Sequence, residues 1–113
     1  MTELQLLNDN VMRDLLGDDE ECILDFKRQF LAQAENCLSE MQTFLAQGNF
    51  SKLKDRAHFL KTSARAIGAE LSASALEVIE QQAQENNTML CKAALIELKM
   101  LHKKLKLKID PVS

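Results

Sequence analysis

The chain has 113 residues, of which 46% are hydrophobic and 27% are charged. This composition is typical of a soluble globular domain that is long enough to bury a core. Glycine and proline are scarce, and no segment alternates β-branched and aromatic residues as strands do. No apolar run approaches the roughly 20 residues of a membrane span, and the N-terminus lacks the basic start of a secretory signal. We therefore expect one all-α, cytoplasmic domain over residues 1–113.

The net charge of −3 is unevenly distributed. Up to Gly48, ten acidic and three basic residues give −7, whereas from Asn49 onward seven acidic and eleven basic residues give +4. A basic C-terminal half favours an acidic partner surface. Nucleic acid is not the expected partner, because the whole chain is acidic and contains no Tyr or Trp.

The cysteines favour neither a disulfide framework nor a zinc site. Cys22, Cys37 and Cys91 are odd in number, far apart and without CxxC spacing. Cys37 falls on a predicted core stripe, so it is expected to be a small buried residue.

A short helix is predicted from Asn8 or Asp9 to Leu16, with Gly17 just after its end. Asp18 or Asp19 then starts the longest helix. Its apolar face is wide, because leucines at seven-residue intervals lie beside the main core stripe. The stripe consists of Ile23, Phe26, Phe30, Ala34, Cys37, Met41 and Phe44, and the leucines are Leu24, Leu31, Leu38 and Leu45. Such a face predicts a bundle helix with two neighbours, although the leucine spacing also allows a coiled-coil dimer.

The third predicted helix begins near Phe50 and runs to about Ile67, after the turn at Gly48-Asn49. One stripe at helical spacing predicts its buried side: Phe50, Leu53, Ala57, Leu60, Ala64 and Ile67. Gly68 ends this helix or permits close approach of a neighbouring segment.

Two further helices complete the prediction, joined by a turn at Asn86-Asn87 with Thr88 as N-cap. The apolar residues of the fourth helix are Leu71, Ala75, Val78, Ile79 and Ala83, and those of the last helix, to about Leu107, are Leu90, Ala94, Leu98, Leu101 and Leu105. The connections are short. We therefore expect an antiparallel four-helix bundle over about 8–107, with a short additional N-terminal helix and a flexible tail over 108–113.

The last helix has a second apolar strip opposite its core stripe. The strip consists of Met89, Ala93, Ile96, Met100 and Leu107. It is either core packing assigned to the wrong face or an exposed patch for dimerisation or a fused partner. A monomer is the default expectation. His102 borders the core stripe, which favours a structural or solvent-exposed role over a second phosphorylation site.

The motifs of self-contained enzymes are absent. The sequence has no glycine-rich phosphate loop, no serine nucleophile elbow and no HExxH zinc motif. His58 lies roughly 130° from the core stripe of the third helix, so its imidazole is expected to face water. Neutral imidazole is nucleophilic near physiological pH. We therefore interpret His58 as a nucleophile whose reaction partners come from another protein.

The residues around His58 fit a site that receives negative charge. Lys54, Lys61 and Arg65 are predicted on the same outer sector of the helix. A phosphoryl group on the imidazole would add about two negative charges, which Lys61 and Arg65 are placed to offset. Thr62, at i+4, lies beside the imidazole, where either its methyl group narrows access or its hydroxyl donates a hydrogen bond to the imidazole or the phosphoryl group.

The segment His58-Phe59-Leu60-Lys61-Thr62-Ser63, followed by Gly68-Ala69, resembles the H-x-L-K-G-S…G-A signature of histidine-containing phosphotransfer (HPt) domains. The resemblance extends from about Leu7 to Leu107. It implies a phosphohistidine at His58, electrostatic support from Lys61, and Gly68 as the glycine that closes the motif. Thr62 stands where the family usually has glycine, and Ser72 where it usually has an apolar residue.

The resemblance also implies the role of the protein in two-component signalling. Such a domain accepts a phosphoryl group from a receiver-domain aspartate and passes it to an aspartate on another receiver. The expected partners are receiver domains of response regulators and of a hybrid histidine kinase, not nucleic acid or membranes. The chain would be a phosphocarrier rather than an enzyme, with no cofactor or metal, since magnesium belongs to the receiver. The alternative is a helical adaptor of the same fold that binds receivers or other proteins without carrying phosphate.

Overall fold

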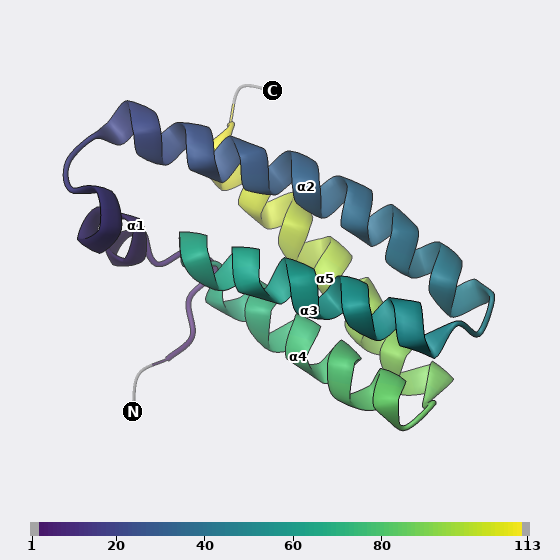
Figure 1. Cartoon of the computed structure of the whole chain (residues 1–113). Helices are drawn as coiled ribbons and strands as arrows, with labels where there is room; N and C mark the ends of the chain where they lie inside the picture. Colours follow the sequence, from purple (N-terminus) through teal and green to yellow (C-terminus); the bar gives the residue numbers. More distant parts are fainter. Residues whose placement is uncertain (1–2, 112–113) are drawn as a thin grey trace.

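The computed structural model describes residues 3–111, and helices account for most of this part of the chain. They are α1 (Asp9–Leu16), α2 (Glu20–Ala46), α3 (Phe50–Ile67), α4 (Glu70–Gln84) and α5 (Thr88–Ile109) (Figure 1). The four longer helices form an antiparallel bundle, and α1 lies at the end where α2 begins. The predicted all-α fold is confirmed.

Polar caps fix the starts of the helices. The side chains of Asn8, Asp19, Asn49 and Asn87 each accept a hydrogen bond from a backbone N–H two or three residues later. These bonds satisfy amides that have no partner within the helix. The predicted cap Thr88 is wrong by one position, because the Asn87 side chain accepts the bond at the start of α5.

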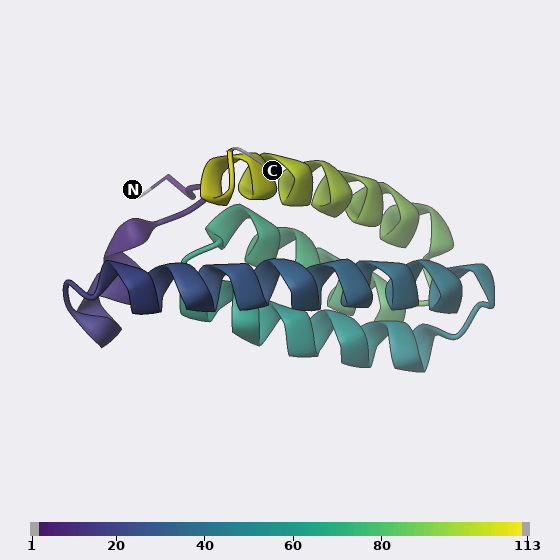
Figure 2. The ribbon, with the colours of Figure 1, turned by 90° about the horizontal axis from the view of Figure 1, so that it is seen from above.

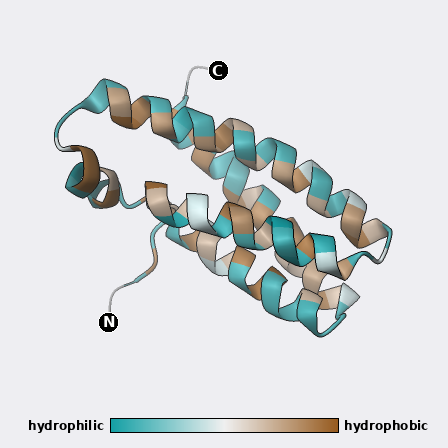
Figure 3. Cartoon of the chain, viewed as in Figure 1, coloured by the Kyte–Doolittle hydropathy of each residue, from teal (hydrophilic) through white to brown (hydrophobic). Residues whose placement is uncertain are grey.

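Each helix buries one side in a common core, and α3 and α5 occupy opposite corners of the bundle. α3 packs against α2 and α4, and α5 packs against the same two helices. Figure 2 shows α3 and α5 on opposite sides of the molecule, and Figure 3 shows hydrophobic and hydrophilic residues alternating along every helix. The largest fully enclosed core side chains are Met41, Leu53, Leu60, Leu76, Ile79 and Leu105. A surface on α3 and a surface on α5 therefore face different neighbours.

Three predicted core residues are exposed: Phe26, Val78 and Leu90. Phe26 lies at the edge of α2, opposite the small Ser63 and Ala66 of α3, which leave its ring uncovered. The buried face of α4 keeps Ala75, Ile79 and Ala83 of the predicted stripe but is turned away from Val78. It includes the unpredicted Leu76 instead of Val78.

The core face of α5 is likewise shifted from the predicted one. Cys91 and Leu95 are buried where Leu90 was expected. His102 is buried too, and its Nε2 lies 3.5 Å from Oε1 of Glu35 on α2. The side chain of His102 therefore belongs to the packing between α2 and α5.

The C-terminal segment is fixed further than predicted. α5 continues to Ile109, which is buried, and the Asp110 carboxylate accepts hydrogen bonds of 3.1 and 2.9 Å from Arg28. The predicted tail is thus wrong for its first residues, and its last two, 112–113, lie outside the described part. Within residues 3–111, none of the helices has the length and apolar character needed to cross a membrane.

The second apolar strip on α5 lies on the surface. Met89, Ala93, Ile96, Met100 and Leu107 are all exposed. The interpretation of this strip as misassigned core packing is therefore wrong.

Candidate functional site

His58 lies in the middle of α3, and its side chain is 67% exposed. The neighbouring Ala57 and Leu60 are buried and anchor this turn of the helix in the core. The imidazole Nδ1 lies 3.2 Å from Oε2 of Glu80 on α4. The predicted exposure of His58 is confirmed, and a carboxylate from the neighbouring helix holds one of its ring nitrogens.

The helical spacing predicted Lys61 on the outer sector of α3 with His58. The structure places it elsewhere. Its side chain is only 11% exposed, and its Nζ lies 2.7 Å from Oε1 of Glu80. A lysine can place its aliphatic stem between two helices while its ammonium group meets an acidic partner. Lys61 therefore contacts the site through Glu80, between α3 and α4.

Glu80 is a site residue that the helical pattern of the sequence did not single out. Its side chain is 14% exposed, and its two oxygens contact His58 and Lys61 separately. Burial raises the pKa of the Glu80 carboxyl, but the contacts with Lys61 and then His58 outweigh burial and hold this pKa below its ordinary value. Glu80 is therefore ionised at neutral pH.

An ionised carboxylate accepts hydrogen bonds and cannot donate them. The contact with Glu80 therefore places the proton of the neutral His58 imidazole on Nδ1. The other ring nitrogen, Nε2, then keeps its lone pair on an imidazole that is mostly exposed. This arrangement makes Nε2 the nucleophilic atom of the site.

The other predicted site residues on α3 are placed differently from one another. Lys54 donates a 2.9 Å hydrogen bond to Oε1 of Gln84, which ties it to the end of α4. Arg65 is exposed and borders a groove between α3, α4 and the N-terminal segment. The Thr62 hydroxyl donates to the backbone carbonyl of His58 over 3.3 Å, so it is engaged by its own helix and not by the imidazole.

Gly68 acts at the end of α3 and does not touch His58. Its φ of 84° is in the left-handed region, where it forms the C-cap of the helix. Its carbonyl accepts a 2.8 Å hydrogen bond from the Asn8 backbone, and a Cβ at this position would overlap with the carbonyl oxygen of Asn8. Both predicted reasons for glycine, helix termination and close approach, are confirmed.

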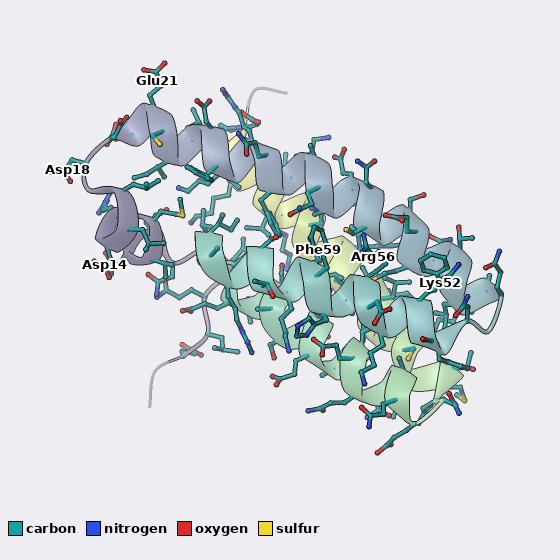
Figure 4. All side chains as sticks on the ribbon, in the orientation of Figure 1. Asp14, Asp18, Glu21, Lys52, Arg56 and Phe59 are labelled. Carbon is teal, nitrogen blue, oxygen red and sulfur yellow. The ribbon has the colours of Figure 1, made fainter. Side chains whose placement is uncertain are left out.

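A basic and aromatic surface adjoins His58 on the side of α2. The Arg56 guanidinium lies 4.9 Å from the ring centroid of Phe59, which is 42% exposed. Lys52 lies over Phe44 one turn earlier. Figure 4 shows Lys52, Arg56 and Phe59 along α3. The acidic Asp14 in α1, Asp18 in the following loop and Glu21 at the start of α2 lie far away.

The Hpt domain family model matches residues 25–108. The chain belongs to the Hpt domain family. These domains take part in phosphotransfer in phosphorelay signalling and interact with receiver domains. Hpt domains are typically non-catalytic phosphocarriers.

The fold also matches a solved structure. It is similar to the crystal structure of histidine-containing phosphotransfer protein B from Pseudomonas aeruginosa PAO1, with a TM-score of 0.82 and 20% sequence identity. The match covers 96% of this chain and 95% of that chain. No curated protein sequence gave a significant match. Among residues 3–111, no group of three His, Cys, Asp or Glu side chains is placed to hold a metal ion.

Proposed function

We propose that His58 is the phosphoaccepting residue of this Hpt domain. It receives a phosphoryl group from an aspartyl phosphate on the receiver of a hybrid histidine kinase and passes it to an aspartate of a response regulator. The observation that carries this proposal is the contact between His58 Nδ1 and Glu80, which leaves Nε2 of an exposed imidazole free of its proton.

The transfer step follows from this protonation state. Nε2 attacks the phosphorus of the aspartyl phosphate, a nitrogen–phosphorus bond forms, and the bond from phosphorus to the aspartate oxygen breaks. The aspartate leaves as a carboxylate. The proton on Nδ1 stays in place, so the ring becomes a phosphorylated imidazolium that the Glu80 carboxylate stabilises. Transfer to the next receiver reverses these bond changes.

Lys61 supports the reaction indirectly. Its ammonium group pairs with Glu80 at 2.7 Å and helps to keep that carboxylate ionised. Arg65 is exposed on α3, one turn beyond Lys61, and supplies positive charge near the phosphoryl group. Lys54 is held by Gln84 and contributes only to the local field.

The receiver is expected to approach from the side of α2. Receiver active sites are built from clustered aspartates, and Arg56 with Phe59 gives this side of His58 positive charge and apolar area. The α4 side instead presents acidic Glu77 and Glu80. Thr62 narrows the surface beside the imidazole, where the family usually has glycine.

Incubation with a phosphorylated receiver tests the proposal. The expected result is an acid-labile, base-stable label on the wild-type chain, absent in His58→Gln and retained in the matched control His102→Gln. Binding of the receiver without transfer of the label would reject the relay function and favour the non-carrying adaptor.

A further inference from the structure

The outer face of α5 carries an apolar strip that none of the described helices covers. Met89 is 82% exposed, Leu107 63% and Met100 57%, and Ile96 and Ala93 are exposed between them. Isolated exposed apolar residues are common, but a continuous row along one helix marks a binding surface.

The spacing of the strip is that of a helix-packing seam. Its members follow at alternating intervals of four and three residues from Met89 to Met100, and Lys103 and Leu107 continue the same alternation. This is the heptad pattern with which one α-helix packs along another. The seam lies opposite the buried side of α5, which contains Cys91, Leu98 and Leu105.

Positive charges flank the seam on one side, whereas the other side carries Glu97 and Lys104. Lys92, Lys99 and Lys106 occupy the position directly before each of the residues Ala93, Met100 and Leu107, on the side that faces α2. Lys99 contacts Gln42, and Lys106 lies 3.2 Å from Glu35, which leaves most of this row unbalanced by acidic groups. In paired helices, the charges at these positions select the partner.

We propose that this face of α5 binds an amphipathic helix of a partner protein, whose apolar seam is flanked by acidic residues. A second copy of this chain fits less well. In antiparallel pairing the rows of Lys92, Lys99 and Lys106 would face each other, and in parallel pairing Lys103 would face itself inside the seam. A membrane surface fits less well because the strip is narrow and lacks aromatic residues.

The position of α5 allows this helix and a receiver to bind together. α5 lies at the corner of the bundle opposite α3, which carries His58 (Figure 2). A helix bound to α5 therefore leaves the imidazole accessible, and the partner would tether the chain without blocking phosphotransfer. The inference does not depend on the role of His58.

A designed helix provides the test. The probe is a three-heptad peptide with leucine in the seam and glutamate at the flanking positions, and the matched control peptide carries lysine at those flanks. Fluorescence anisotropy with the full chain should show binding of the acidic peptide only. Met100→Glu should weaken this binding about tenfold or more, because it removes buried apolar area and opposes the glutamates.

Two variants separate the surface from general effects. Lys92→Glu combined with Lys99→Glu should weaken binding of the acidic peptide and improve binding of the lysine-flanked peptide. Leu15→Glu replaces an apolar residue on α1 that is 69% exposed, and it should change the binding of neither peptide. His58→Gln should bind the acidic peptide normally, which distinguishes this surface from the phosphotransfer site.

Three results would overturn the proposal. The first is equal binding, or no binding, of the two peptides. The second is a dimer in sedimentation that Met100→Glu dissociates, which assigns the strip to a second copy. The third is Met100-dependent binding to phosphatidylglycerol vesicles without peptide binding, which assigns it to an anionic membrane.

Discussion

Replacing Glu80 with alanine tests the chemical core of the site. The substitution removes the acceptor 3.2 Å from His58 Nδ1 and the partner 2.7 Å from Lys61 Nζ. Without that acceptor, nothing in the contacts of His58 favours the proton on Nδ1 over Nε2. A fraction of the imidazole then carries its proton on the atom that must attack phosphorus.

The expected loss follows from the strength of one hydrogen bond. A hydrogen bond to a charged group contributes about 1.5–3 kcal/mol, and the low end applies because the imidazole is mostly exposed to screening solvent. About 1.4 kcal/mol corresponds to a tenfold change in rate. Glu80→Ala should therefore slow phosphotransfer about tenfold. Glu80→Gln keeps a neutral acceptor with roughly half the strength and should slow it about threefold.

Single-turnover transfer from a phosphorylated receiver, stopped by rapid quenching, measures the rate. Nitrogen NMR of the imidazole reports independently which ring nitrogen carries the proton. Glu77→Ala is the matched control, because it removes an exposed carboxylate one turn earlier on α4. A thermal melt of each variant by circular dichroism separates a loss of fold from a loss of rate.

Two results would contradict this role of Glu80. If Glu80→Ala transfers phosphate at the wild-type rate and its imidazole still carries the proton on Nδ1, Glu80 does not set the tautomer. An equal fall of the transfer rate in Glu77→Ala would show that the general negative charge of α4 sets the rate, and not the contact of Glu80 with His58.

Three further predictions concern the supports of the site and the fold. The pKa of Glu80 lies below its ordinary 4.5, so its stabilising contribution is present above that value and is lost as the pH falls through the folded pKa. Lys61→Met should move this loss to higher pH in a carbon NMR titration of the carboxyl; an unchanged titration would contradict the role of Lys61. Gly68→Ala should lower the free energy of unfolding by denaturant by about 2–3 kcal/mol, because it adds left-handed strain and breaks a hydrogen bond. Gly48 has open space around it, so Gly48→Ala should lower this free energy by only about 1–2 kcal/mol. Equal losses in the two variants would show that the contact of Gly68 with the N-terminal segment does not stabilise the fold. Ser72→Ala should raise the melting temperature, because the buried Ser72 hydroxyl has no hydrogen-bond partner among residues 3–111. A lower melting temperature would refute this.

Most boundaries of the first three helices were predictable because short-range chemistry determines them. Asp19 caps α2, Gly17 ends α1, and Gly68 ends α3, each at the position that the residue types favour. The exposure of His58 was predictable for the same reason, since its angle to the core stripe depends on α3 alone.

The contact between Glu80 and Lys61 was not predictable in this way. Glu80 and Lys61 meet because α4 is rotated so that Leu76, and not Val78, faces the core. The periodicity of one helix places its residues relative to each other and not relative to the next helix. A weak signal was nonetheless present: Glu80 lies three residues before the buried Ala83, so the two residues are neighbours on one face of α4.

The burial of Lys61 changes how the charge of the phosphoryl group is balanced. Glu80 is largely buried and stays ionised with the help of the Lys61 ammonium group, so the two opposite charges cancel each other between α3 and α4. Little of the positive charge of Lys61 then remains to hold a phosphoryl group on His58. The new negative charge instead meets the exposed Arg65 and the solvent. If His58 carries a phosphoryl group as proposed, little fixed positive charge in its own domain would hold that group in place. An intermediate carrier requires this property, because it must give the group up to a second receiver.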